Sequence, residues 1–79
     1  MVEIEPKLQS IFRKVLRNDD FVLERNLTAE DVEGWDSLSH LQLIMRTEKE
    51  FTVRFTATEA TSLPNIGALV DLIRAKLPA

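Results

Sequence analysis

Gly34-Trp35-Asp36-Ser37-Leu38 is the stretch on which the fold of this chain depends. Gly34 ends any regular secondary structure before it, and Asp36 and Ser37 are both favourable helix N-cap residues. The segment that follows, up to Phe51, has apolar residues at helical spacing and contains neither Gly nor Pro. The sequence therefore predicts that Ser37 lies in the first turn of a helix, where the helix dipole stabilises an anion such as phosphate.

Two more amphipathic helices are predicted at the two ends of the chain. The first begins near Ile4 and is ended by Asn18-Asp19-Asp20, and the last runs from Asn65, a favourable N-cap, to about Leu77. Their apolar residues recur three or four positions apart, which is the spacing of one helix face. These stripes are Ile4, Leu8, Ile11, Phe12, Val15 and Leu16 in the first helix and Ile66, Leu69, Val70, Ile73 and Leu77 in the last.

The segment over residues 19–36 is the longest irregular part of the chain. It carries apolar residues throughout, so we expect it to be pinned onto the helices; they are Phe21, Val22, Leu23, Leu27 and Val32. Thr28-Ala29-Glu30-Asp31 could form a single helical turn capped by Thr28.

Residues 51–55 alternate between apolar and polar like a strand, but no second run exists to pair with them. We therefore expect an extended connector with Phe51, Val53 and Phe55 turned inward. Thr56-Ala57-Thr58-Glu59 fits a capping box and predicts a short third helix that stops by Pro64. The expected fold is an all-α four-helix bundle, with a long loop between its first two helices and a short third helix.

Length and composition limit the possible functions. A chain of 79 residues buries only about 60% of its unfolded surface, so we expect one small domain over residues 1–79 without a deep catalytic pocket. The chain has no Cys, so it has no thiol of its own. Its net charge is −3 and its basic residues are scattered, which argues against nucleic-acid binding. No segment approaches the roughly 20 apolar residues of a membrane helix, and residues 1–5 lack a signal-peptide pattern. We expect a soluble, cytoplasmic monomer.

The central stretch resembles the acyl carrier protein family, in which a phosphopantetheine arm is esterified to the serine of an Asp-Ser-Leu motif. The resemblance covers roughly residues 4 to 77, nearly the whole chain. Asp-Ser-Leu alone would be weak, but its place in a four-helix pattern of this length makes the match specific. The further matching residues are Gly34-Trp35, Leu41, Ile44, Glu48-Lys49-Glu50-Phe51 and Leu63-Pro64-Asn65-Ile66. Because the chain begins and ends at its helices, a freestanding carrier is expected.

This resemblance implies that Ser37 receives 4′-phosphopantetheine from coenzyme A, through a phosphopantetheinyl transferase. Asp36 would cap the helix or contact the transferase or its metal, and Leu38 completes the motif. The implied protein is not an enzyme: it has no catalytic residues and no metal of its own. Its expected partners are acyl-loading, condensing or acyltransferase enzymes, in a specialised lipid or polyketide-type pathway.

The predicted second helix, at about 37–50, has a wider apolar face than burial on one side requires. Either it is wedged between two neighbours, or part of that face meets partner proteins. The family resemblance favours the second explanation for Leu38 and Met45. We expect a partner surface made of Leu38, Leu41, Gln42, Met45, Arg46, Glu48 and Lys49. Residues 37–50 balance two acids against two bases, whereas housekeeping fatty-acid carriers of this family have a strongly acidic second helix.

Several alternatives compete with this interpretation. Ser37 could be a plain helix cap in a small interaction module without a prosthetic group, or the cargo could be aminoacyl or peptidyl. His40 lies one helical turn after Ser37, so a Ser-His-Asp arrangement is conceivable, although we expect His40 to pack on the preceding loop and Trp35 to pack at the loop end. Four carboxylates over residues 30–36 could bind a metal or a basic partner, but a solvated loop is favoured.

Overall fold

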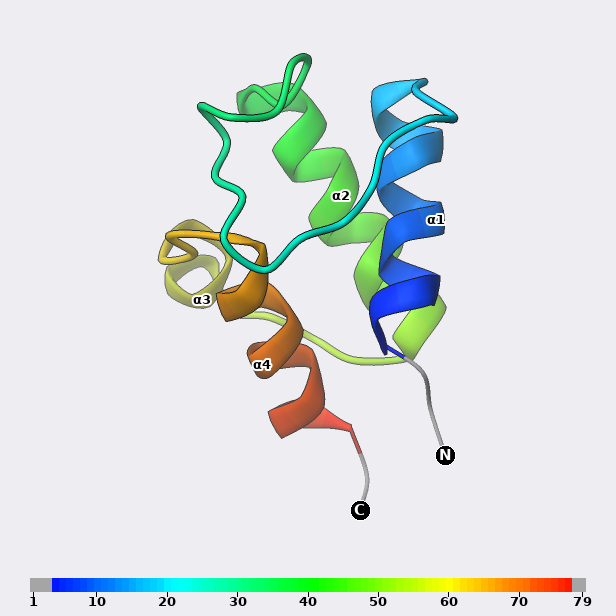
Figure 1. The fold of residues 1–79 in the computed structure, drawn as a ribbon. Coiled ribbons are helices and arrows are strands. Elements are labelled where there is room, and N and C mark those ends of the chain that lie inside the picture. The colour runs from blue at the N-terminus through cyan, green and yellow to red at the C-terminus, as the bar shows by residue number, and fades with distance from the viewer. Residues whose placement is uncertain (1–3, 78–79) are drawn as a thin grey trace.

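The computed structural model describes residues 4–77, and within that range it has four helices and no strand. They are α1 (Ile4–Leu16), α2 (Ser37–Phe51), α3 (Ala57–Thr61) and α4 (Ile66–Lys76). The all-α four-helix prediction, with its long first loop and short third helix, is confirmed. Figure 1 shows α1 and α2 side by side, with α4 beneath them and the short α3 at the edge of the molecule.

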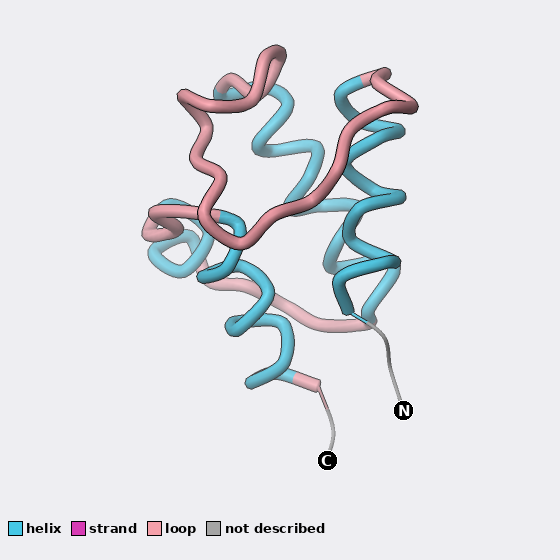
Figure 2. Tube along the Cα trace, in the orientation of Figure 1, coloured by secondary structure: helices cyan, strands magenta, loops and turns pink. Residues whose placement is uncertain are grey.

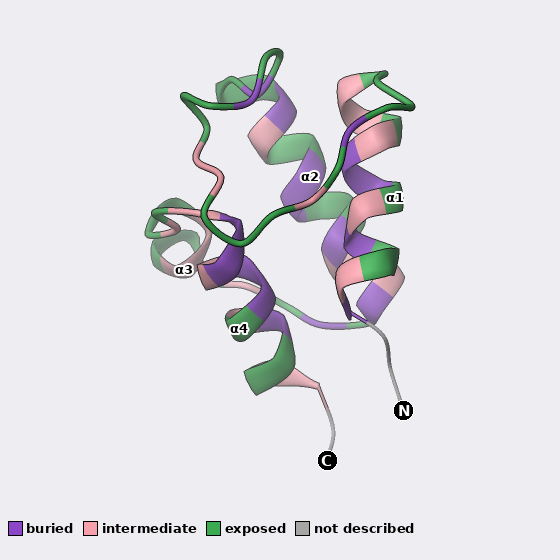
Figure 3. Ribbon diagram, viewed as in Figure 1, coloured by how far each residue is buried: buried purple, intermediate pink, exposed green. Residues whose placement is uncertain are grey.

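The core lies where α1, α2 and α4 face one another. Both predicted stripes at the ends of the chain point inward, and Leu8, Phe12, Val70 and Ile73 are fully buried. The buried bands follow the inner faces of these helices in Figure 3. By contrast, α3 has no buried residue. The hydrophobic effect therefore acts mainly through α1, α2 and α4, whereas α3 contributes only the partly buried Ala60 to the packing against the core.

The segment over residues 17–36 crosses the front of the bundle as an ordered loop (Figure 2). Phe21 stacks on Phe12 with ring centroids 5.2 Å apart, and the Gln9 side chain accepts a hydrogen bond from the Leu23 backbone N–H at 2.9 Å. Farther along, the Leu27 carbonyl accepts a bond from the Ile66 N–H at 2.9 Å. The prediction of a pinned loop is confirmed, except that Val22 is 62% exposed.

Gly67 is the position where this loop meets α4. Its backbone N–H donates to the Arg25 carbonyl at 2.8 Å. A Cβ at residue 67 would lie only 3.0 Å from that same oxygen. The loop can therefore dock this closely only against a residue without a side chain.

Two local predictions need correction. Phe51 is the last residue of α2 and not part of the connector, because the helix ends at Thr52 in the left-handed conformation (φ 56°). Residues 28–31 form a single turn, in which the Asp31 N–H donates to the Thr28 carbonyl at 3.0 Å, but its cap differs from the predicted one. The Asp31 carboxylate accepts hydrogen bonds from the backbone N–H and the hydroxyl of Thr28. The side chain that caps this turn is therefore that of Asp31 and not that of Thr28. Phe51 and Val53 are buried and Phe55 is half-buried, as expected.

Candidate functional site

The first turn of α2 is built by a reciprocal capping box. Asp36 is the N-cap, and its carboxylate accepts a hydrogen bond from the Ser39 backbone N–H at 2.9 Å. In return, the Ser39 hydroxyl accepts from the Asp36 N–H at 2.8 Å and donates to the Gly34 carbonyl at 2.6 Å. The Ser39 backbone N–H lowers the pKa of Asp36 most, because it donates to the carboxylate, and the Ser39 hydroxyl, 3.0 Å from the same carboxylate, lowers this pKa further. The start of the helix is therefore held without help from Ser37.

Ser37 is the first residue of α2, as predicted, and its side chain is exposed. The side-chain hydrogen bonds around it join Asp36, Ser39 and Gly34, and within residues 4–77 none includes the Ser37 hydroxyl. Its position at the helix N-terminus lies in the positive end of the helix dipole. The hydroxyl is thus accessible and unpaired, at a place suited to a phosphate ester.

An open hollow of about 400 Å³ lies beside Ser37. It is lined by Ala29, Trp35, Asp36, Ser37, His40, Thr61 and Leu63. The lining comes from the end of the long loop, the start of α2, and the segment around the end of α3. A slender group attached to Ser37 has room there, so the residues present fit a phosphopantetheine arm.

His40 joins the loop to α3. The Trp35 Nε1–H donates to His40 Nδ1 at 3.1 Å, so Nδ1 is the accepting nitrogen and Nε2–H donates to the Ala60 carbonyl at 2.7 Å. Both ring nitrogens are occupied, and neither is available as a base for Ser37. This geometry removes the Ser-His-Asp alternative. The predicted packing of His40 on the loop is confirmed, and its bond to α3 is an addition.

Trp35 packs at the end of the loop, as expected. It is only 8% exposed, and its ring meets Phe12 edge to face with centroids 5.2 Å apart. Its indole N–H is satisfied by His40. The ring therefore connects the core to the wall of the hollow beside Ser37.

Most of the predicted partner surface lies on the outer face of α2. Leu38, Leu41 and Met45 form an exposed apolar edge, with 66%, 56% and 60% of their surfaces accessible. The exposed polar residues beside this edge are Gln42, Arg46 and Lys49. Of the two explanations for the wide apolar face, the exposure of these three residues favours a surface that is not buried against a neighbouring helix.

Glu48 differs from its expected place on the partner surface, and Ser39, in the first turn of the same helix, is buried. Glu48 is partly buried, and its carboxylate accepts a hydrogen bond from the Phe55 N–H at 2.9 Å, so it supports the connector. Ser39 is only 8% exposed, because the capping box turns its side chain inward. Neither position could be told from helical periodicity, since both depend on segments outside the helix.

The acidic residues before α2 do not assemble into a metal site. Among the residues that the structure describes, no three of the His, Asp and Glu side chains come together as possible ligands of one ion. Asp31 and Asp36 instead accept hydrogen bonds from Thr28 and Ser39.

The wall of the hollow that faces Ser37 is formed by Thr61 and Leu63. The sequence did not predict it, because no periodic signal relates residue 37 to residues 61–63.

Comparisons with known proteins agree with this geometry. The family model described as "Phosphopantetheine attachment site" matches residues 6–73. The acyl carrier protein of Buchnera aphidicola subsp. Baizongia pistaciae (strain Bp) is 32% identical over 75 residues, covering 94% of this chain and 95% of that protein. The solution NMR structure of a holo acyl carrier protein from Geobacter metallireducens has a TM-score of 0.87 and 39% identity, and covers 95% of this chain and 86% of that one.

The chain therefore belongs to the phosphopantetheine-attachment family, and within it to the acyl carrier proteins. It is a carrier and not a catalyst, and its prosthetic group is phosphopantetheine. Carriers of this family work with the enzymes that modify them and with enzymes that act on acyl groups. Within residues 4–77, no helix is long and apolar enough to cross a membrane.

Proposed function

We propose that Ser37 is the attachment residue and that the chain carries acyl intermediates for a specialised lipid or polyketide-type pathway. The observation that carries the assignment is the exposed, unpaired Ser37 hydroxyl at a helix start that Asp36 and Ser39 already hold. When bound, the arm supplies a terminal thiol that holds acyl groups as thioesters. The chain is proposed to act as a cytoplasmic monomer.

Each neighbouring residue has its own part in this proposal. Asp36 and Ser39 hold the first turn, so that residue 37 is presented to the transferase at a fixed place on the helix start. Leu38, Leu41 and Met45 provide apolar area against which the transferase and the acyl-handling enzymes dock. Trp35 and His40 shape the hollow beside Ser37.

The test of attachment is the intact mass of the protein after incubation with coenzyme A, magnesium and a broad-specificity phosphopantetheinyl transferase. Wild type should gain one pantetheine adduct, and Ser37→Ala should gain none. Ser62→Ala is the matched control, since Ser62 is exposed and lies outside the motif, and it should be loaded like wild type. Loading of Ser37→Ala to the same extent as wild type would contradict the assignment.

The Ser37→Ala variant should remain folded, because Asp36 caps the helix. We expect its free energy of unfolding to change by less than about 0.5 kcal/mol, as for other surface substitutions. Truncating the fully buried Ile73 to Ala should cost about 2–5 kcal/mol. Thermal melts of the two variants measure the difference, and equal losses would mean that Ser37 is a structural residue.

The specialised pathway is supported by the charges on the outer face of α2. Arg46 and Lys49 are exposed there and Gln42 is neutral. A basic patch on an enzyme adapted to an acidic helix would be repelled by these cations, which slows encounter and disfavours the wrong partner. The proposal thus predicts slow exchange with the malonyl-loading enzyme of general fatty-acid synthesis.

The experiment is the double substitution Gln42→Glu with Lys49→Glu on arm-loaded protein. Its loading by that enzyme should be faster than wild type at low salt, and the gain should shrink as salt screens the charges. If wild type already matches a housekeeping carrier and the substitutions change nothing, the pathway assignment is wrong. Intact mass of the protein isolated from its native host would identify the attached group.

A further inference from the structure

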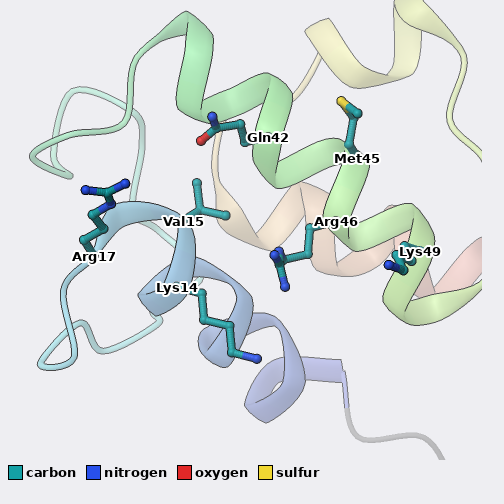
Figure 4. Close-up of a pocket in the computed structure, with 7 residues that line it drawn as sticks. All are labelled: Lys14, Val15, Arg17, Gln42, Met45, Arg46 and Lys49. Atoms are coloured by element: carbon teal, nitrogen blue, oxygen red, sulfur yellow. The ribbon is translucent and has the colours of Figure 1, made fainter.

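A second concave surface lies away from the Ser37 hollow, between the last turn of α1 and the outer face of α2. It is a groove of about 490 Å³. It is lined by Lys14, Val15 and Arg17 at the end of α1 and by Gln42, Met45, Arg46 and Lys49 on α2 (Figure 4). Helical periodicity within α2 indicated only Arg46 and Lys49 as a pair of bases. Packing of the two helices adds Lys14 from α1 and Arg17, the residue just after α1.

The groove is strongly basic although the whole chain is acidic. Four of its seven lining residues are Lys or Arg and none is Asp or Glu, whereas the chain has a net charge of −3. Within residues 4–77, the salt bridges join other cations, Arg25, Arg74 and Lys76, to carboxylates. None of the four groove cations forms a salt bridge with another described residue, so four like charges are left close together around the groove.

The groove is continuous with the exposed apolar edge of α2. Met45 belongs to both, and the edge reaches back through Leu41 to Leu38, the residue after Ser37. A protein that docks on α2 to reach Ser37 therefore lies close to the groove. Val15 and Met45 also place apolar surface among the cations, so the groove combines an apolar strip with basic groups.

We propose that this groove receives an acidic amphipathic helix of an enzyme that loads or processes the cargo. A helix that presents apolar residues flanked by carboxylates matches both features, and laying such a helix between two packed helices is a common mode of recognition. The identity of the partner as a cargo enzyme rests on the function proposed above, whereas the binding chemistry does not. The four cations surround a hollow on two helices, which favours an inserted segment over a flat lipid surface.

The test uses a fluorescent helical peptide about five turns long, with a Leu stripe flanked by Glu. A second peptide has Gln at every Glu position. Binding to the full chain is measured by fluorescence anisotropy, and the contact surface is mapped by amide chemical shifts. The Glu peptide should bind at low salt, weaken at high salt and shift residues 14–17 and 42–49, and the Gln peptide should bind more weakly.

Three matched charge reversals test whether the groove acts as one site. Lys14→Glu changes its α1 side and Arg46→Glu its α2 side, while Arg54→Glu makes the same charge change at an exposed residue outside the groove. Lys14→Glu and Arg46→Glu should each weaken binding about fivefold or more, and Arg54→Glu should have a much smaller effect. Equal effects of all three variants, or shifts mapped elsewhere, would overturn the proposal.

Two further measurements separate this proposal from the one above and from a lipid partner. Ser37→Ala should bind the Glu peptide like wild type, so a failure of arm loading and a failure of groove binding are observed independently. Vesicles of phosphatidylglycerol are tested by co-sedimentation. Binding to these vesicles that Lys14→Glu and Arg46→Glu abolish, without binding of the Glu peptide, would identify a membrane surface and overturn the proposal.

Discussion

Helices α2 and α3 begin in the same way but differ in everything that follows. Each starts with a complete capping box, Asp36 with Ser39 in α2 and Thr56 with Glu59 in α3. Yet α2 has 15 residues, of which five are buried, and α3 has five residues, none of them buried. A capping box determines where a helix begins, whereas the buried area behind it determines how long and how stable the helix is.

The weaker attachment of α3 matters because α3 borders the hollow at Ser37. It is held by the bond from His40 to the Ala60 carbonyl and by the salt bridge between Glu59 and Lys76, 2.9 Å long. Leu63, just beyond it, is only partly buried. One wall of the hollow is therefore fixed by the core-packed α2, and the other by these polar contacts together with the smaller apolar contacts of Ala60 and Leu63. The predictions below test this difference.

The largest effect should come from removing buried surface of α2. Leu43 is 1% exposed, so Leu43→Ala should lower the free energy of unfolding by about 2–5 kcal/mol. Leu41→Ala is the matched control on the same helix, since Leu41 is 56% exposed, and it should change stability by less than about 0.5 kcal/mol. Chemical denaturation measures both variants, and similar losses would show that the two faces of α2 are not distinct.

His40→Ala should detach α3 while leaving the rest of the bundle in place. It leaves the Trp35 indole N–H and the Ala60 carbonyl without their partner, which should cost about 1–3 kcal/mol. Amide exchange should accelerate over residues 57–61 and much less in α1 and α4. Gln42→Ala, at an exposed position of α2, serves as the control. Uniform acceleration over all helices would mean that His40 supports the whole core.

Thr47→Val should stabilise α2. Thr47 is fully buried, and within residues 4–77 its hydroxyl is the one buried side-chain polar atom without a hydrogen-bond partner. Valine has nearly the same shape and no unsatisfied group, so we expect a gain of about 1 kcal/mol. A rise in melting temperature checks this. A fall in melting temperature would contradict this prediction, because it would mean that the Thr47 hydroxyl stabilises the fold through a hydrogen bond. Thr47→Ser, which keeps the hydroxyl, would test that explanation.

Acid should loosen α3 more than α2. The Lys76 side chain and then the Thr56 N–H lower the pKa of Glu59 below its ordinary value of 4.5, because both donate to its carboxylate. A lowered pKa in the folded state contributes stability above the ordinary value, and this is lost as the pH falls through the lowered pKa. The pKa of Asp36 is lowered too, but α2 keeps its buried residues when the cap is protonated.

The measurement is amide exchange over residues 57–61, compared between neutral pH and about pH 3 after correction for intrinsic rates. Glu59→Gln should show weaker protection of α3 at neutral pH and a smaller loss on acidification. Glu33→Gln, at an exposed loop residue, should behave like wild type. If α2 and α3 lose protection together, the attachment of α3 does not depend on Glu59.

Much of the fold could be predicted because local rules governed it. The stripes of α1 and α4, the caps at Asp36, Thr56 and Asn65, and the place of Ser37 in the first turn of α2 follow from periodicity and N-cap chemistry. Periodicity misleads where a contact with a segment flanking the helix decides the outcome. Ser39 is turned inward by Gly34 and Asp36, and Glu48 is engaged by Phe55. A helical wheel contains neither of these contacts.

The sequence by itself determined the four helices, the absence of any thiol of the chain's own, and the motif at residues 36–38 that identifies a phosphopantetheine carrier. Only the tertiary structure decided that His40 bridges Trp35 to Ala60 and that Lys14 and Arg17 join Arg46 and Lys49 around one groove. The physical reason is the distance along the chain over which each kind of interaction acts. Propensity, capping and periodicity act within a few residues, whereas a hollow or a charged groove depends on how whole helices pack against one another.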